Sequence, residues 1–194
     1  AIRAVVDTGS ARTLSLEDLD DYHFESGPFA LGVSTRINRT HIARQGRLAD
    51  DVSFGPITLT NPIVNESDDD NLLGQGVLKN FVVSFDQSAR VVRFQRPDAP
   101  LAEPIQAAPL YGHGAILNAT ADGLRIESLA DESPAGQAGA QEGDLLIAVD
   151  GATMADLGCA IREGRSDIPR TLRWTLDRKG APITIELTTQ LLIP

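Results

Sequence analysis

The chain has 194 residues, of which 42% are hydrophobic and 23% charged, so it is long enough for one large domain or for two domains of about 100 residues each. Its formal net charge is −10; residues 1–96 hold 10 basic and 13 acidic residues (−3), and residues 97–194 hold 7 and 14 (−7). Neither half carries a basic patch for phosphates, which argues against a nucleic-acid partner.

Cysteine and histidine usage argues against a disulfide, a metal centre or another cofactor. The only cysteine, Cys159, lies in an apolar stretch and is expected to be a buried structural thiol. The three histidines are scattered without the spacing of metal ligands. No apolar run approaches the roughly 20 residues that span a bilayer. The opening residues, AIRAVVDTGS, already form part of a predicted strand, so we expect a longer protein that is truncated here at its N-terminus.

The first half of the chain, residues 1–97, is predicted to be a β domain made of short strands and turns. In chain order, the predicted elements are a strand at 4–6, a turn at 7–10, short helical turns at 16–21 and 77–80, and a hairpin formed by 81–85 and 91–94 around the turn 86–89.

The second half is predicted to be a small α+β domain over residues 106–194, after a proline-rich linker at 98–105. Its predicted strands lie at 124–128, 145–149, 172–176 and 183–187, and its two predicted helices at 134–140 and 155–163. The fold class expected for the whole chain is therefore mainly β, with two domains.

One motif in the first half carries catalytic chemistry. Asp7-Thr8-Gly9-Ser10 follows an apolar strand, and the segment NLLGQGVL begins about 65 residues further on, just before the predicted hairpin. Together they resemble one lobe of the retropepsin and pepsin-like aspartic peptidases, over about residues 1–97. The resemblance implies a closed β lobe, peptide or protein substrates, and Asp7 as one of two catalytic aspartates. It also implies that Leu72, Leu73 and Gly74 pack behind the Asp-Thr-Gly loop as part of a ψ-shaped loop.

In that family two neighbouring carboxylates share one proton, so one activates water while the other donates to the scissile carbonyl. The resemblance gives Thr8 a hydrogen bond to the partner loop, Gly9 close backbone approach, and Ser10 a place near the carboxylate. This chain has one Asp-Thr-Gly. We interpret the acidic clusters Asp50-Asp51 and Asp68-Asp69-Asp70 as solvated loops.

The second aspartate must therefore come from a homodimer or from a preceding lobe of a longer polypeptide. The outer strand that precedes the Asp-Thr-Gly hairpin in such lobes is missing here, which puts the activity of this chain alone in question. We place the flap that closes over substrate within about residues 26–44, where Gly27-Pro28 and Gly32 supply hinge or tip chemistry.

The stretch from Glu132 to Gly151 resembles PDZ domains, particularly those attached to bacterial proteases. Its fold-determining residues are a helix start at Ser133-Pro134, a helix stop at Gly139, the pair Gly143-Asp144, and the turn Asp150-Gly151. The resemblance covers about residues 106–190. It implies a peptide partner and makes a bacterial cell envelope or periplasm the candidate compartment.

PDZ domains add a peptide strand to a sheet edge and hold its terminal carboxylate with backbone N–H groups. The resemblance places this groove at Tyr111, Gly112, His113, Gly114, Ala115 and Ile116, with Leu157 and Ile161 on the facing helix. No basic residue is expected to neutralise a carboxylate, so an internal segment or the chain's own tail, residues 191–194, remain alternative ligands.

Two functions remain. The first is an aspartic endopeptidase whose PDZ domain recruits substrates or regulates access. The second is a non-catalytic peptide-binding or scaffold protein with a degenerate protease lobe. A serine hydrolase is disfavoured, because Ser10 and Ser133 lack a Gly-x-Ser-x-Gly elbow and no histidine is tied to either.

Overall fold

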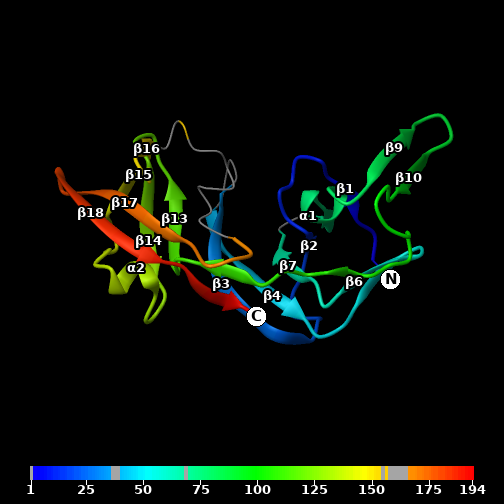
Figure 1. Cartoon of the computed structure of the whole chain (residues 1–194), viewed down its shortest axis with the longest axis horizontal. Helices are drawn as coiled ribbons and strands as arrows, with labels where there is room; N and C mark the ends of the chain where they lie inside the picture. The colour runs from blue at the N-terminus through cyan, green and yellow to red at the C-terminus, as the bar shows by residue number, and fades with distance from the viewer. Residues whose placement is uncertain (1, 36–39, 68–69, 154–155, 157–165) are drawn as a thin grey trace. The chain divides into compact units, whose positions relative to one another are not determined.

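A computed structural model of the chain describes residues 2–35, 40–67, 70–153, 156 and 166–194 (Figure 1). The chain is mainly β, as the sequence predicts, and the described part holds two short helices. It forms two compact units. The first unit comprises Ala1–Phe29 and Ala43–Ala107, and the second comprises Ala30–Ile42 and Ala108–Pro194.

The elements up to residue 107 are nearly all short strands. In chain order they are β1 (Val5–Val6), β2 (Leu14–Leu16), β3 (Phe24–Thr35), β4 (Thr40–Leu48), β5 (Val52–Phe54), β6 (Ile57–Thr60), β7 (Ile63–Glu66), β8 (Leu72–Leu73), α1 (Gln75–Leu78), β9 (Val82–Asp86), β10 (Val91–Gln95) and β11 (Ile105–Gln106).

The main sheet of this part has the strand order β1-β8-β2-β7-β4-β3. Strand β8 lies between β1 and β2, parallel to the first and antiparallel to the second, although it is more than 50 residues from either in sequence. Smaller sheets are formed by β11-β6-β5 and by the hairpin β9-β10. The core contains the buried side chains of Leu14, Leu16, Leu19, Leu48, Leu59, Val64, Leu73, Val77 and Leu78.

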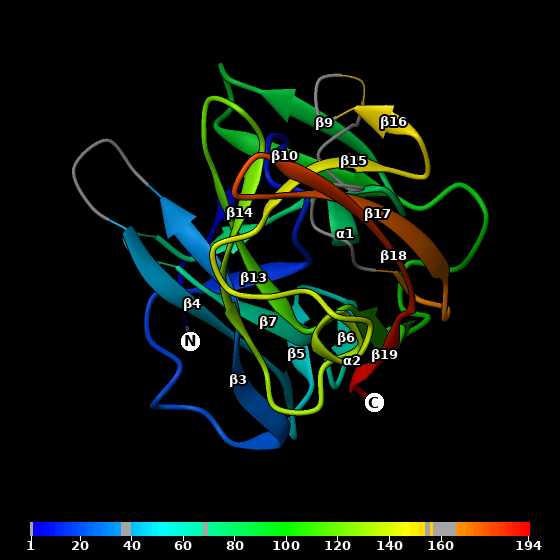
Figure 2. The same ribbon diagram turned by 90° about the vertical axis from the view of Figure 1, so that its left-hand side faces the viewer.

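The elements after residue 107 are β12 (Leu110–Gly112), β13 (Ala115–Ala119), β14 (Leu124–Leu129), α2 (Pro134–Gln137), β15 (Leu145–Val149), β16 (Ala152–Thr153), β17 (Thr171–Arg178), β18 (Ala181–Thr188) and β19 (Gln190–Ile193). The large sheet runs β13-β14-β15-β17-β18, with β16 paired to β15 (Figure 2). A second, two-stranded sheet joins β12 to the C-terminal strand β19. The core of this unit surrounds Trp174, which is 1% exposed.

Several predicted elements are confirmed. Strands β14, β15, β17 and β18 overlap the four strands predicted in the second half, and β9 and β10 form the predicted hairpin. Helix α2 lies within the predicted helix 134–140, and Ser133 caps it, because its Oγ accepts the Gly136 N–H at 3.2 Å. The predicted helix 155–163 lies, except for residue 156, outside the described residues.

The helical turn predicted at residues 16–21 is wrong. Leu16 ends strand β2, and the residues after it form bends and turns that belong to no helix. All three residues of β2 are buried, because β2 lies between β7 and β8 in the sheet. Pairing with distant strands therefore overrides the local helical spacing.

Candidate functional site

The Asp7 loop leaves the edge strand of the main sheet. The N–H of Val5 donates to the Asn71 carbonyl at 2.8 Å, and the N–H of Asp7 donates to the Leu73 carbonyl at 2.9 Å. The parallel ladder between β1 and β8 thus ends at the candidate catalytic aspartate. The structure brings the two predicted motifs together, with Leu72 and Leu73 directly beside the strand that carries Asp7.

Hydrogen bonds within the loop orient the Asp7 carboxylate. Its Oδ1 accepts the N–H of Gly9 at 2.8 Å, and a Cβ built on Gly9 would stand 3.3 Å from that same oxygen. The side chain of Gln75 donates to the Thr8 carbonyl at 2.9 Å. Asp7 is half-buried, whereas Thr8 and Gly9 are exposed. A fixed but accessible carboxylate is the arrangement that water activation needs.

Gly74 closes the back of this loop. Its N–H donates to Thr13, and the next two residues, Gln75 and Gly76, donate to the carbonyls of Ser10 and Arg12 at 2.8 and 2.9 Å. A Cβ at Gly74 would lie 2.4 Å from the Arg12 carbonyl oxygen. Only glycine permits this approach, so the close packing depends on the residue type at this position. Ser10, the fourth predicted site residue, contributes through its carbonyl and through its Oγ, which accepts the Arg12 N–H at 3.3 Å.

Among the residues that the structure describes, no second carboxylate is hydrogen-bonded to Asp7. The same part of the chain contains no cluster of three or more His, Cys, Asp or Glu residues that could hold a metal ion. It also contains no helix that is long and apolar enough to cross a membrane.

The hairpin of β3 and β4 occupies the region where we predicted a flap. Gly27-Pro28 lies inside β3 and not at a tip, and a Cβ at Gly27 would stand 3.0 Å from the Gln45 carbonyl oxygen of β4. Gly32 also lies in β3, and residues 36–39, between the two strands in sequence, lie outside the described residues.

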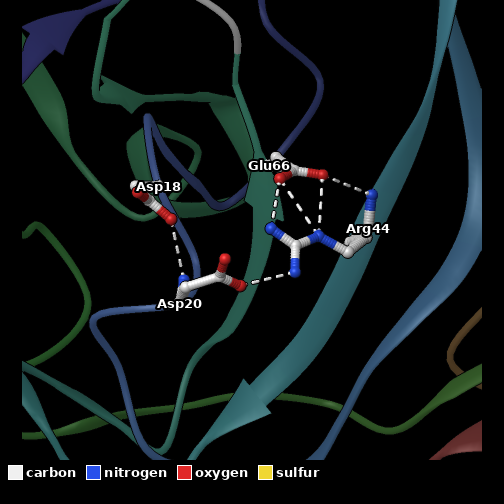
Figure 3. A network of polar contacts seen from close by, with 4 residues as sticks. All are labelled: Asp18, Asp20, Arg44 and Glu66. Carbon is white, nitrogen blue, oxygen red and sulfur yellow. Dashed lines mark hydrogen bonds and ion pairs between the residues drawn. The ribbon is translucent and has the colours of Figure 1, made fainter.

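Arg44, in the middle of β4, forms a network of charged contacts that the sequence did not suggest (Figure 3). Its guanidinium donates to Glu66 at the end of β7 at 2.6 Å and to Asp20 at 2.6 Å, and its backbone N–H also donates to Glu66. Hydrogen bonds to Glu66 and then Asp20 raise the pKa of Arg44 above its ordinary value. A permanently charged fork of this kind positions strands and moves no proton.

In the second unit, the predicted Gly-rich loop is fixed to helix α2. The carbonyls of His113 and Gly114 accept from Ala135 and Ala130 at 3.1 and 2.8 Å. Gly114 has a φ of +71°, and a Cβ there would stand 2.5 Å from the Cβ of Ser133. The loop can therefore approach the helix start only with glycine at this position.

His113 is buried in this loop. Its Nδ1 accepts the N–H of Ala115 at 3.0 Å, and its ring packs edge-on against Trp174 with ring centroids 4.7 Å apart. A ring nitrogen that accepts a hydrogen bond carries no proton, so this geometry assigns the tautomer protonated at Nε2.

A pocket of about 260 Å³ lies at this loop. Its lining consists of Gly112–Ile116, Ser128–Ala130, Leu192, Ala30 and Leu31, all of which belong to the second unit. Strand β13, at the end of the large sheet, leads away from the pocket, and among the described residues its outer edge is not paired. Sequence reasoning found the loop but missed Ser128–Ala130 and Leu192, whose part in the lining depends on non-local folding.

Tyr111 lies in β12, which pairs with the C-terminal strand β19. It pairs with Leu191 of β19, and its backbone N–H and carbonyl also bond to Ser166 at 2.8 and 3.2 Å. Ile193 is fully buried. The two other predicted groove residues, Leu157 and Ile161, lie outside the described residues.

Asp144, from the predicted Gly-Asp pair, is 2% exposed and joins three segments of the second unit. Arg178 donates to both of its carboxylate oxygens at 2.8 and 2.7 Å and also to the Gly139 carbonyl, while the Gln141 N–H donates to Asp144 at 2.9 Å. The hydrogen bonds from Arg178 hold the pKa of Asp144 below its ordinary value. This pair joins the segment after α2, the start of β15 and the end of β17.

Known protein-family models do not match the chain, and comparison with curated proteins gives no match either. Several solved structures are similar, and three of them are the following. The photosystem II D1 C-terminal processing protease is 23% identical with a TM-score of 0.37, over 42% of this chain and 23% of that chain. The HtrA-type protease AlgW with a decapeptide is 12% identical (TM-score 0.41, 90% of this chain, 63% of that one). The serine endoprotease from Yersinia pestis is 15% identical (TM-score 0.39, 97% and 67%).

All three of these similar structures are proteases. The chain spans less than a quarter of the first and about two thirds of the other two. At TM-scores below 0.5, the similarity does not define a catalytic type.

Proposed function

We propose that residues 1–97 form one lobe of an aspartic peptidase and that residues 106–194 form a PDZ domain that binds peptide segments. The observation that carries the first part is the Asp7 loop: a carboxylate on an exposed loop, bound to its own Gly9 N–H and backed by β8 and Gly74. A surface turn without a function does not need a second, distant segment packed this closely behind it.

The proposed reaction requires a second carboxyl group beside Asp7. Two adjacent carboxyls share one proton. The ionised one takes a proton from water as the water oxygen bonds to the peptide carbon, and the protonated one donates to the carbonyl oxygen. The tetrahedral intermediate then breaks its C–N bond: the first carboxyl gives the proton that it took from water to the leaving nitrogen, and a hydroxyl of the intermediate returns a proton to the second carboxylate. A second copy of the chain or a preceding lobe supplies the second carboxyl in this proposal.

The hairpin of β3 and β4 is the proposed flap. Arg44 in the middle of β4 is bound to Glu66 of β7, and Gly27 lets the two strands of the hairpin approach closely.

The alternative, a non-catalytic peptide-binding protein, rests on the absence of a second carboxylate at Asp7 in the described part of the chain. The two proposals differ in turnover. We therefore propose to incubate the 194-residue chain with a mixed peptide library from acid to neutral pH and to identify products by mass spectrometry, beside Asp7→Asn and the control Asp50→Asn. Asp50 is an exposed aspartate of the same unit, outside the Asp-Thr-Gly frame.

Cleavage that is lost in Asp7→Asn and kept in Asp50→Asn would support the peptidase, with the dyad assembled from two copies. Cleavage that persists in Asp7→Asn would refute Asp7 as the catalytic group. If none of the three proteins cleaves, the same assay is run on the chain extended by a second Asp-bearing lobe. Cleavage by the extended protein would support the peptidase, and its absence would support the non-catalytic peptide-binding function. Circular-dichroism melts must match among the variants for the comparison to count.

A further inference from the structure

The loop of the second unit already uses one of the backbone donors that a terminal carboxylate would require. A carboxylate is held by successive N–H groups that point at one place. Here the N–H of Ala115 donates to Nδ1 of His113 at 3.0 Å. A carboxylate oxygen that bound the Ala115 N–H would face the lone pair of His113 Nδ1. It would also leave Nδ1, a buried acceptor, without the N–H that now donates to it.

His113 cannot readily turn away to release this N–H. Its side chain is buried, with the residue 4% exposed, and its ring packs against Trp174 in the core. The loop itself is fixed, because the carbonyls of His113 and Gly114 accept hydrogen bonds from the N–H groups of residues 135 and 130. Rearrangement of the loop for a carboxylate would break several of these contacts at once.

The charge around the pocket also disfavours an anion. Among the residues that the structure describes, its lining contains no Lys or Arg, and the polar side chains in it are those of His113 and Ser128. The chain from residue 97 onwards carries 7 basic and 14 acidic residues, a net charge of −7. A buried carboxylate without a cation is unfavourable, whereas an apolar side chain against Ile116, Leu129 and Leu192 gains from burial.

From these contacts we infer that the pocket binds an internal apolar segment of a peptide chain and disfavours a free C-terminal carboxylate. The segment pairs with the edge of β13 that no other described strand occupies, and it places an apolar side chain in the pocket. This inference rests on the proposed peptide-binding function of the second unit and adds its ligand class.

The test uses one set of labelled octapeptides rich in Val, Leu and Ile, each made in three forms: with a free C-terminal carboxylate, with a C-terminal amide, and embedded between Gly-Ser flanks. Binding to the full chain is measured by fluorescence anisotropy. We expect the amide and embedded forms to bind at least about tenfold more tightly than the free acid, which corresponds to about 1.4 kcal/mol.

Tighter binding of the free acids would overturn the inference and leave the peptide-binding function intact. If none of the three forms binds, the proposed peptide-binding function fails and the inference with it.

His113→Phe tests the cause, because it keeps a ring against Trp174 and removes the acceptor. We expect the amide preference to fall about tenfold in this variant and to stay unchanged in the control His23→Phe, which replaces an exposed histidine of the first unit. An undiminished preference in a folded His113→Phe protein would refute the role of Nδ1. If that variant does not fold, the comparison of peptide forms on the unaltered chain still decides the ligand class.

Discussion

Replacement of Gly74 by alanine tests whether the Asp7 loop and β8 are packed as closely as the structure places them. The new Cβ would lie 2.4 Å from the Arg12 carbonyl oxygen, 2.9 Å from that of Ser10 and 3.0 Å from the Ser10 Oγ. Ordinary contacts begin at 3.4 Å, so the Arg12 carbonyl must move by about 1 Å (3.4 − 2.4). That movement lengthens the 2.9 Å hydrogen bond from Gly76.

The expected change in the free energy of unfolding is the sum of three contributions. Overpacking of this kind costs about 1–3 kcal/mol, and a weakened hydrogen bond costs about 1 kcal/mol. The alanine also restricts the unfolded chain, which returns about 0.4–1 kcal/mol. We expect a net loss of about 2 kcal/mol and a melting temperature of the first unit that is lower by about 10 °C. Gly74 has a φ of −106°, which alanine adopts freely, so the loss arises from the contact alone.

Two measurements check this prediction without relying on catalysis. Calorimetry gives the melting temperature, and amide hydrogen exchange follows the N–H of Asp7, which should exchange faster once its bond to Leu73 loosens. Gly55→Ala is the control in the same unit, because a Cβ there meets nothing within 4 Å and only its φ of +57° is unfavourable. A Gly74→Ala protein with an unchanged melting temperature and unchanged exchange at Asp7 would refute the close packing.

Two further predictions concern the second unit. Asp144→Asn should lower its stability at pH 7 by about 2 kcal/mol, because a hydrogen-bonded charge pair is lost. Since Arg178 lowers the pKa of Asp144 in the folded state, this contribution is present above the ordinary aspartate pKa of about 3.9 and is lost as the pH falls through the lowered folded value. Urea unfolding at several pH values should therefore show a difference between the two proteins that shrinks below about pH 4, and a constant difference would contradict the assignment. Trp174→Ala should remove about 3–5 kcal/mol in the same assay and Trp174→Phe markedly less; equal losses would argue against cavity formation as the cause.

The elements that sequence patterns predicted are those whose signals are local. The turn residues 86–89 between two apolar runs predicted the β9–β10 hairpin, and Ser133 and Pro134 predicted the start of α2. The family resemblance predicted that Leu73 packs behind the Asp7 loop. In the structure the N–H of Asp7 donates to the Leu73 carbonyl at 2.9 Å.

What the sequence could not predict depends on pairing between distant segments. Nothing near Leu191 indicates that β19 pairs with β12, some 80 residues earlier. The contacts of Arg44 with Asp20 and Glu66 lie 24 and 22 residues apart and follow no motif. The alternation of apolar and polar residues in β2 covers only three residues, which is too short to mark Leu16 as part of a strand.

The place of β8 between β1 and β2 determines when the candidate site can form during synthesis. Val5 pairs with Leu72, so the Asp7 loop has no backing until 67 further residues have left the ribosome. Contacts of such long range form late, because the loop-closure entropy must be overcome first. The carboxylate is therefore held in its proposed working geometry only in a completed lobe. A nascent chain that still lacks β8, or a cleaved chain that has lost it, carries the Asp-Thr-Gly motif without the site.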